Sequence, residues 1–467
     1  MSVSVVVTVT LLMLAVLGYS FNTKDQRLEQ GGLLQFATIP SGAKVIVDKM
    51  PLSSRTPSKA TADATSHAVT MSLDGYRTWQ KSISLKPAMI GWLSYTRLIP
   101  VNLKAEKVKT LPTLAGVLPS QDRKWFALVT DAAKPEISIA DLQNDKVAFR
   151  SVALPPTSFT APAVGKTQSF QLVSWSENGQ WLLVKHTYDD AKTEWLAVDR
   201  ENAAKTENIT AGLGIAASKI VFAGRDGRTA FAHTEGTLRR LNLNEKTISR
   251  PLMVGVEDFS VYDADTALYT TLPDPAIKQR TVGYVREDMK TSQQLGAYAD
   301  DGQPVKIAMS EYFGKRYVAT SHGASVHITT GELPRQDNRG SQKTVASFTT
   351  TSTIQRLSMS SNGRFVIAET TDSYTVNDLE LMKTYTTKLK NVTGAMRPLK
   401  WLDPFMAWYD AGGMLRLYEF DGMNQQDTIA VAEGYDVVLS PNNKYLYTIG
   451  HDGSGLSLQR VRMIIDN

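Results

Sequence analysis

Residues 173–184 read VSWSENGQWLLV, and related stretches recur along most of the chain. Residues 357–368 read LSMSSNGRFVIA, and residues 438–447 read VLSPNNKYLY. In each copy a strand-like run leads into a polar turn and then into a more apolar run. The Asn-Gly pair supplies the positive φ angles that a tight hairpin requires. Each copy therefore predicts two antiparallel strands.

Eight such turns occur in the second part of the chain. Marked by one residue each, they stand at positions 123, 179, 227, 265, 314, 363, 404 and 443, and the copies at 265 and 404 are the weakest. The seven steps from 123 to 443 have a mean length of about 46 residues. A third strand ending in a polar pair follows each turn, as in WLAVD at 195–199, and a weaker fourth strand comes next. Four strands in ~40–50 residues are typical of a β-propeller blade.

The last copy is incomplete. Residues 456–462 can supply its third strand, but too little chain follows for a fourth. Residues 107–111 lie just before the first copy, and we predict that they complete the last blade and close the ring, because closure removes exposed sheet edges. We predict eight blades over residues 107–467, with seven as the alternative. The pattern Ser-x-Asn-Gly-x-aromatic resembles TolB-like and WD-repeat-like propellers, the former more closely, because the Trp-Asp pair of WD repeats is missing.

Residues 34–106 show a different, period-two pattern, which predicts a small antiparallel β-sandwich. Strands are predicted near 34–39, 43–48, 67–72, 82–85 and 97–103, and an apolar-aromatic loop at 89–95. The run TIPSGAKVIVD at 38–48, followed in order by Thr56-Pro57, His67-Ala68-Val69 and Gly75-Tyr76, resembles the PEGA domain. Ser41 and Lys49 depart from that family's pattern, which has Glu and Gly there. The resemblance implies a non-catalytic module of the bacterial cell envelope.

The N-terminal segment is apolar. Residues 1–22 contain no charged side chain, and 20 helical residues at 1.5 Å each cover the ~30 Å hydrocarbon core of a bilayer. We favour a transmembrane signal-anchor at residues 1–21; the alternative is a signal peptide cleaved after the small-x-small sequence at 18–20. Residues 22–33 are predicted to form a polar stalk. This interpretation predicts a single-pass protein of the cell membrane with an extracytoplasmic body.

Composition excludes several classes of protein. The 467 residues are 21% charged and 42% hydrophobic with a net charge of +5, which is unlike a disordered chain or a dedicated nucleic-acid binder. The lack of cysteine excludes disulfides, cysteine-ligated metal sites and a lipobox. Residues 33–106 hold nine basic and four acidic side chains, which equals the whole net charge. This basic surface is interpreted as a solvated face or, alternatively, as a contact for anionic lipid headgroups or wall polymer.

No catalytic, cofactor-binding or metal-binding residue is predicted. The chain shows no phosphate loop or dinucleotide fingerprint, and its six histidines are scattered. His67 is interpreted as a strand residue with local hydrogen bonds. The favoured function is a membrane-anchored, extracytoplasmic scaffold whose propeller binds a protein or glycan of the envelope, without a cofactor or nucleic acid. The alternative is a propeller hydrolase or lyase that acts on a cell-wall polymer through carboxylates from different blades.

Overall fold

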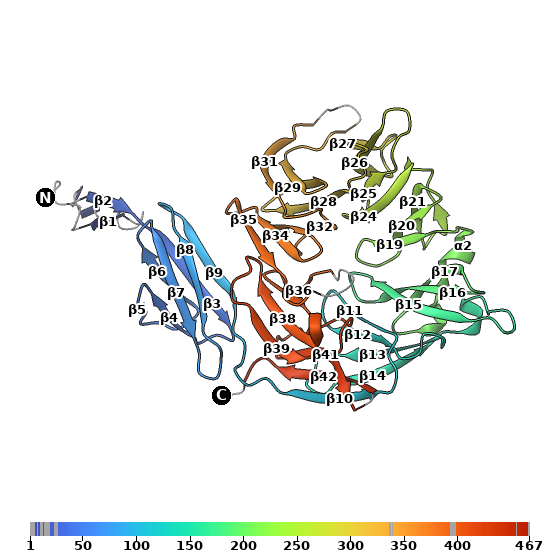
Figure 1. Ribbon diagram of the computed structural model, residues 1–467, viewed down its shortest axis with the longest axis horizontal. Helices are drawn as coiled ribbons and strands as arrows, with labels where there is room; N and C mark the ends of the chain where they lie inside the picture. The colour runs from blue at the N-terminus through green and yellow to red at the C-terminus, as the bar shows by residue number, and fades with distance from the viewer. Residues whose placement is uncertain are drawn as a thin grey trace.

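The computed structural model describes residues 5, 6, 8, 9, 13, 19–22, 27–335, 338, 340–392, 398–453 and 455–465. These residues form a short hairpin, a β-sandwich and a ring of β-sheets, in this order along the chain (Figure 1). The hairpin pairs β1 (Tyr19–Asn22) with β2 (Arg27–Gln30), so part of the predicted stalk is strand. Most of the predicted anchor lies outside the described residues, and among those described no helix is long and apolar enough to cross a membrane.

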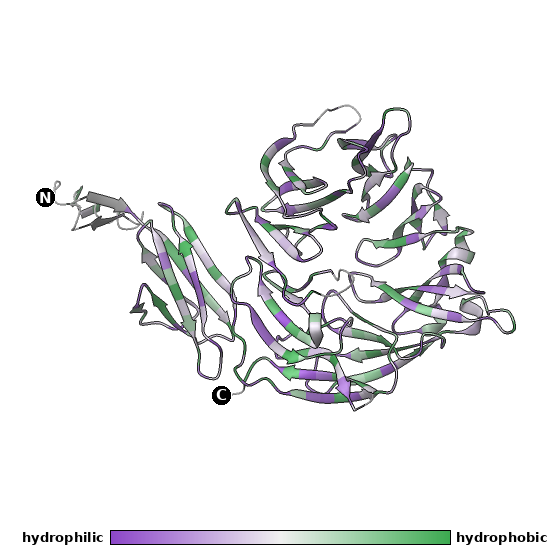
Figure 2. Ribbon diagram, viewed as in Figure 1, coloured by the Kyte–Doolittle hydropathy of each residue, from purple (hydrophilic) through white to green (hydrophobic). Residues whose placement is uncertain are grey.

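The sandwich consists of two sheets. One has the order β6 (Ser58–Ala62), β3 (Gly32–Ile39), β9 (Ile90–Arg97), and the other has the order β5 (Met50–Pro51), β4 (Lys44–Val47), β7 (Ser66–Ser72), β8 (Trp79–Ser84). Alternate residues of β3 are buried, as the period-two pattern requires. Figure 2 shows hydrophobic and hydrophilic residues interleaved along the strands of both domains. The predicted sandwich is therefore confirmed.

Two details of the predicted sandwich are wrong. The sheet is mixed, because β9 crosses from the other sheet and runs parallel to β3. The last strand lies at Ile90–Arg97, where a loop was predicted, and it does not continue through 98–103. The apolar run conceals a regular alternation, in which Gly91 and Leu93 point into the core while Ile90 and Trp92 are partly exposed.

In the part of the chain that the structure describes, the ring contains eight sheets of four antiparallel strands in simple up-and-down order, one of them with a short fifth strand. The first four sheets contain β11 (Gly116–Pro119), β12 (Trp125–Val129), β13 (Glu136–Asp141), β14 (Ala148–Ala153); β15 (Gln168–Trp175), β16 (Trp181–Tyr188), β17 (Lys192–Asp199), β18 (Glu207–Asn208); β19 (Lys219–Ala223), β20 (Thr229–Thr234), β21 (Thr237–Asn242), β22 (Thr247–Ile248), β23 (Met253–Val254); and β24 (Val256–Val261), β25 (Thr266–Thr271), β26 (Gln279–Arg286), β27 (Gln293–Ala299).

The next three sheets contain β28 (Val305–Tyr312), β29 (Lys315–His322), β30 (Ser325–Thr330), β31 (Lys343–Thr349); β32 (Arg356–Met359), β33 (Phe365–Glu369), β34 (Ser373–Asp378), β35 (Lys383–Lys388); and β36 (Lys400–Asp403), β37 (Met406–Tyr409), β38 (Met414–Glu419), β39 (Gln426–Ala430). Helices in the ring are short: η1 (Pro156–Ser158), η2 (Ala203–Lys205), α2 (Ile209–Leu213) and η3 (Ala411–Gly413). All eight predicted turn positions lie between the first and second strands of successive sheets, so the repeat is confirmed.

The eighth sheet joins the two ends of the ring. It has the order β10 (Ala105–Leu111), β42 (Gly455–Arg462), β41 (Tyr445–Asp452), β40 (Val438–Leu439). The strand that precedes the first sheet therefore completes the last one, as predicted, with Lys107 opposite Gln459 and Leu111 opposite Leu456. Eight hydrophobic clusters lie between successive sheets, including one between the last sheet and the first. This closed set of inter-sheet cores makes the ring a β-propeller.

A repeated hydrogen-bond network explains the turn pattern. In the second sheet the Ser176 hydroxyl donates to Asn178 Oδ1 (2.8 Å) and accepts from the backbone N–H of Trp181 (2.8 Å). Gly179 follows with φ of 69°. The same serine network recurs at Ser120, Ser360 and Ser440. The pattern thus encodes a turn whose buried polar groups are satisfied within five residues.

Replacement of Ser176 by Ala is expected to lower the free energy of unfolding by ~1–3 kcal/mol, because it removes a buried hydroxyl and leaves the half-buried N–H of Trp181 without this acceptor. Chemical denaturation followed by tryptophan fluorescence measures the change. Ser53, which is exposed, provides the matched control, and its replacement by Ala should change stability by less than about 0.5 kcal/mol. Equal effects of the two substitutions would contradict a structural role for the network.

The sandwich and the propeller share a polar interface centred on Lys81. The Lys81 Nζ atom lies 2.5 Å from Glu419 Oε2, 2.8 Å from Asp421 Oδ2 and 3.0 Å from the Tyr95 hydroxyl. The Trp79 indole N–H donates to Glu419. Burial lowers the pKa of Lys81, but neighbouring Tyr95 and the two carboxylates raise it by more, so the pKa lies above its usual value. Lys81 is therefore a buried cation held by acids of the propeller.

Two further basic residues extend this interface. Arg97 binds Asp403 with its Nε and Nη2 atoms (3.1 and 3.0 Å), and Arg77 donates to Gln426 Oε1 (2.7 Å). Tyr95 stacks on Phe405 with ring centroids 4.7 Å apart. Three of the nine basic side chains of the sandwich thus bind the propeller. They are not part of the solvated or membrane-facing surface that the sequence suggested for the whole set.

Candidate functional site

Two neighbouring cavities lie where the fourth, fifth and sixth sheets meet. The first, of about 320 Å³, lies between the fourth and fifth sheets and is named here the arginine pocket after Arg286, Arg316 and Arg335. The second, of about 430 Å³, is lined by the inner strands β24, β28 and β32 and is named the inner cavity. Tyr262 and Met309 line both cavities, so the two are adjacent.

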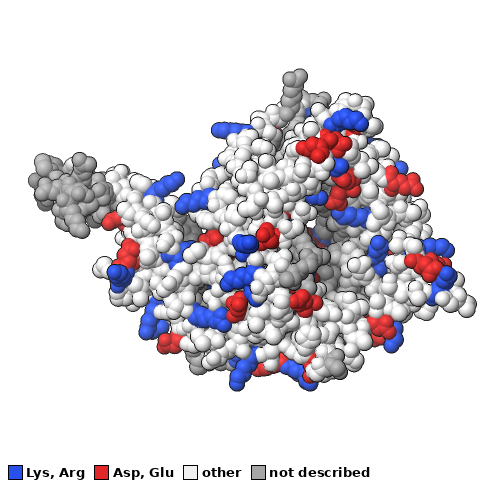
Figure 3. All heavy atoms as spheres, in the orientation of Figure 1, with Lys and Arg blue, Asp and Glu red and all other residues white. Residues whose placement is uncertain are grey.

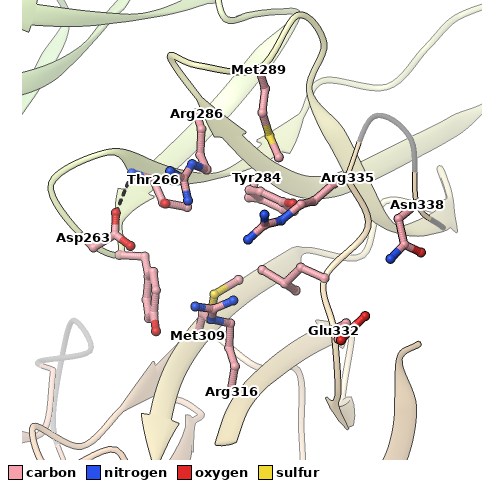
Figure 4. A pocket seen from close by; sticks show the side chains of 12 residues that line it. Asp263, Thr266, Tyr284, Arg286, Met289, Met309, Arg316, Glu332, Arg335 and Asn338 are labelled. Carbon is pink, nitrogen blue, oxygen red and sulfur yellow. Dashed lines mark hydrogen bonds between the residues drawn. The ribbon is translucent and has the colours of Figure 1, made fainter. Parts of the chain in front are cut away.

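The three arginines come from separate elements. Arg286 ends β26, Arg316 lies near the start of β29, and Arg335 lies in the loop between β30 and β31. Figure 4 shows their guanidinium groups directed toward one space beside Tyr284. Burial raises the pKa of Tyr284, and Arg335, Arg286 and Arg316 lower it in part, so all three act on this one hydroxyl. Three positive charges therefore face one space, whose lining also includes the two carboxylates of Asp263 and Glu332.

The three guanidinium groups differ in their partners. Arg286 forms a two-point ion pair with Asp288, with distances of 3.0 and 3.2 Å. Arg316 lies over the Tyr262 ring at 5.8 Å, and its Nε atom is buried without a hydrogen-bond partner in the described part of the chain. Arg335 is exposed and forms no ion pair with a described residue. Two of the three arginines therefore retain donors for a ligand.

Acidic and neutral polar groups complete the arginine pocket. Asp263 Oδ1 accepts the backbone N–H groups of Asp265 (2.9 Å) and Thr266 (2.7 Å), so one of its oxygens serves the turn. Glu332 and Asn338 lie on the opposite side, both exposed (Figure 4). The Tyr284 hydroxyl donates to the Pro334 carbonyl, and its raised pKa keeps it protonated at neutral pH, so it is not available to accept a proton. The arrangement is suited to binding an anion rather than to abstracting a proton.

Charges near the inner cavity are largely paired. Asp258 accepts from Lys219 Nζ at 2.7 Å, and Arg356 lies 3.4 Å from Glu369. Burial raises the pKa of Glu369, and Arg356 lowers it in part. On the face in Figure 3, basic and acidic side chains are interspersed over the propeller without one large patch of a single sign. The arginine pocket is therefore a local feature and not part of a general basic surface.

The predicted role of His67 agrees with the structure. Its Nδ1 atom lies 2.6 Å from Asp48 Oδ2 and its Nε2 atom lies 2.7 Å from the Asp63 carbonyl oxygen, so it is hydrogen-bonded locally. Among the described residues no cluster of three or more His, Asp or Glu side chains could hold a metal ion. The arginine pocket was not predicted. Its three arginines have no motif or regular spacing, and only the packing of two sheets brings them together.

His186 and Glu194 form a buried pair in the second sheet. His186 Nδ1 lies 2.8 Å from Glu194 Oε1, and this carboxylate also accepts the backbone N–H of Thr160 (2.7 Å) and the amide of Asn208 (2.8 Å). Phe170 stacks on the imidazole ring at 4.3 Å. Burial raises the pKa of Glu194, but the hydrogen bonds from His186, Thr160 and Asn208 outweigh this and lower it to about 2. The pair is enclosed and serves stability.

The His186–Glu194 pair predicts that the folded chain loses stability in acid. Because the pKa of Glu194 is lower in the folded chain than its ordinary value of 4.5, its carboxylate stabilises the fold above pH 4.5. That contribution, at most about 3 kcal/mol, is lost as the pH falls from about 4.5 to about 2. Glu194→Gln should flatten the loss of stability over this range, measured by denaturation at several pH values. Glu177→Gln, at an exposed position, is the control. Parallel pH profiles for wild type and Glu194→Gln would contradict the assignment.

Comparison with known proteins identifies the sandwich. The family model described as the PEGA domain matches residues 32–97. Residues 32–97 form a PEGA domain. The PEGA domain therefore precedes the propeller and binds it through Lys81, Arg77 and Arg97. No curated protein sequence matches the chain.

Several solved structures resemble the chain at low sequence identity. The C-terminal WD40 domain of Sif2 has a TM-score of 0.49 and 12% identity, over 78% of this chain and 99% of that one. KlHsv2 with loop 6CD replaced by a Gly-Ser linker has a TM-score of 0.41 and 12% identity, over 75% and 99%. An oligogalacturonate lyase in complex with manganese has a TM-score of 0.42 and 11% identity, over 71% and 98%.

Proposed function

We propose that this chain is a non-catalytic, membrane-anchored binding protein of the cell envelope, whose propeller binds an envelope protein or glycan. The arginine pocket carries the proposal, because it is a recessed site with donors on Arg316 and Arg335 that no described carboxylate occupies. Its volume lies at the lower end of the ~300–1,000 Å³ range of ligand pockets. The PEGA domain supports the proposal as a spacer, because its buried ion pairs fix it to the propeller.

The proposed location depends on the uncharged, apolar sequence of residues 1–22. If this segment anchors the chain, the body is expected to be accessible to protease on intact cells, and carbonate should not extract the protein from membranes. A body protected from protease, or a protein released by carbonate, would overturn the proposed location. These two measurements do not depend on the identity of the ligand.

The basic residues of 33–106 that do not bind the propeller are proposed to contact anionic lipid or wall polymer. Six remain after Arg77, Lys81 and Arg97 are assigned to the propeller: Lys44, Lys49, Arg55, Lys59, Lys86 and Lys104. Each is worth about 1 kcal/mol at best near an anionic surface, and salt screens the effect within ~8 Å. Without residues 1–21, which would insert into any bilayer, the chain should therefore bind vesicles containing anionic lipid at low salt and dissociate at high salt. Binding that is insensitive to salt, or equal on neutral vesicles, would contradict this contact.

A hydrolase or lyase acting on a cell-wall polymer is the second candidate function. The clustered charges of the arginine pocket favour it, because an enzyme also needs convergent polar groups. Two observations oppose it: the raised pKa of Tyr284 keeps its hydroxyl protonated at neutral pH, and Asp263 Oδ1 is already used in a turn. Incubation of the purified chain with cell-wall polymers distinguishes the two functions. Binding of a polymer without its cleavage supports the binding protein. Cleavage of a polymer that is lost in Asp263→Asn and Glu332→Gln supports the enzyme.

A further inference from the structure

Arg316 marks the most specific feature of the arginine pocket. Its guanidinium lies over Tyr262, and its buried Nε atom has no hydrogen-bond partner in the described residues. A buried N–H donor without an acceptor is unfavourable in a folded protein. The Nε atom itself is closed to a ligand, but the terminal nitrogens of the same guanidinium form no hydrogen bond or ion pair with a described residue, so an acceptor in the pocket would find free donors there. Arginine presents a planar fork that matches the two oxygens of a carboxylate or phosphate.

The rest of the lining restricts the body of such a ligand. Met289, Met309 and Leu333 provide an apolar wall, and about 320 Å³ is room for a compact ligand rather than a long chain. Asp263, Glu332 and Asn338 offer acceptors that suit hydroxyl donors. The carboxylates of Asp263 and Glu332 would repel a ligand that carries several negative charges close together. A sugar ring with one anionic group can bond to the arginines through that group and donate hydroxyl hydrogen bonds to the acceptors. An acidic peptide can bond only to the arginines.

We propose that the arginine pocket binds one anionic sugar unit of an envelope glycan, with its carboxylate or phosphate group on Arg316 and Arg335 and its hydroxyls toward Asp263 and Glu332. This proposal rests on the proposed binding function and names the ligand class for it. Arg286, already paired with Asp288, contributes to the local potential but is not assigned a direct bond. The ring of the sugar would lie against the apolar wall of the pocket.

Calorimetric titration of the full chain tests the proposal with four small probes. These are glucuronic acid, glucose 6-phosphate, methyl glucoside and a Glu-Glu dipeptide, used at the same ionic strength. At least one of the two anionic sugars should bind, and binding should weaken as salt rises. The neutral glucoside should bind at least ~10-fold more weakly. Comparison of glucuronic acid with glucose 6-phosphate shows whether the pocket prefers a carboxylate or a phosphate.

Variants then locate the site. Arg316→Met should weaken the anionic sugar at least ~10-fold, and Arg316→Lys less, because lysine keeps the charge without the fork. Arg335→Met is the second variant, because its exposed side chain can be removed without affecting folding. Arg225→Met, at a position whose side chain is 83% exposed, is the matched control and should bind as wild type does.

Several results would overturn the proposal. These are no binding of either anionic sugar, equal binding of the neutral glucoside, tighter binding of the dipeptide, or unchanged affinity in both Arg316→Met and Arg335→Met. If the chain still binds purified envelope material in any of these cases, the binding function stands and only the assigned ligand fails. If neither the probes nor envelope material bind, both proposals fail.

Discussion

Replacing Lys81 with Met is expected to lower the free energy of unfolding by about 3–5 kcal/mol, the usual result of removing one partner from a buried ion pair. The side chains of Glu419 and Asp421 are only 2% and 7% exposed, so both carboxylates would remain buried without their cation. Methionine is unbranched like the lysine stem and only one heavy atom shorter, whereas the contacts of Nζ with Tyr95 and Phe420 are lost together with the charge. The decrease in the free energy of unfolding would therefore come mainly from the missing charge rather than from a cavity. Chemical denaturation followed by tryptophan fluorescence measures it.

The matched control is Lys44→Met, an exposed lysine on another strand of the same domain, for which a change below about 0.5 kcal/mol is expected. Limited proteolysis adds a readout specific to the interface. If Lys81 fixes the PEGA domain to the propeller, the connecting residues 98–104 should become more susceptible in Lys81→Met and not in Lys44→Met. Equal stability and equal proteolysis of the two variants would show that the interface does not depend on this cation.

Most of the propeller could be predicted from the sequence, because its turns are stabilised by hydrogen bonds between residues that are close in the chain. Ser176, Asn178 and Trp181 satisfy one another within five residues, so the network leaves a recognisable pattern at each copy. The closing strand followed from counting, since the last copy lacked a strand and residues 107–111 were unassigned. The pairing of β3 with β9 did not follow, because the choice between parallel and antiparallel partners depends on where the chain crosses between the two sheets.

The contacts between domains and the arginine pocket could not be predicted from the sequence in this way. Lys81 and Glu419 are far apart in sequence, and nothing beside either residue indicates the other. Arg316 and Arg335 carry no motif, and their convergence with Arg286 depends on the angle between two neighbouring sheets. The excess of basic residues in 33–106 was a real signal, but part of it reflects the interface with acids of the propeller. Local hydrogen bonds can be read from spacing, whereas contacts between domains and between sheets require the fold.

Leu111→Ala tests whether closure by β10 holds the propeller together, and it is expected to lower the free energy of unfolding by about 2–5 kcal/mol. Leu111 is 2% exposed and packs in the cluster that joins the last sheet to the first, beside Phe126, Tyr447 and Leu458. Removing its side chain leaves a cavity at the one inter-sheet core in which the two ends of the ring meet. Leu272→Ala, at a position that is 50% exposed, is the control and should cost less than about 0.5 kcal/mol. Denaturation midpoints and hydrogen exchange of β42 measure the effect. If Leu111→Ala unfolds like the control and β42 stays protected, the strand pairs with the last sheet without stabilising the ring.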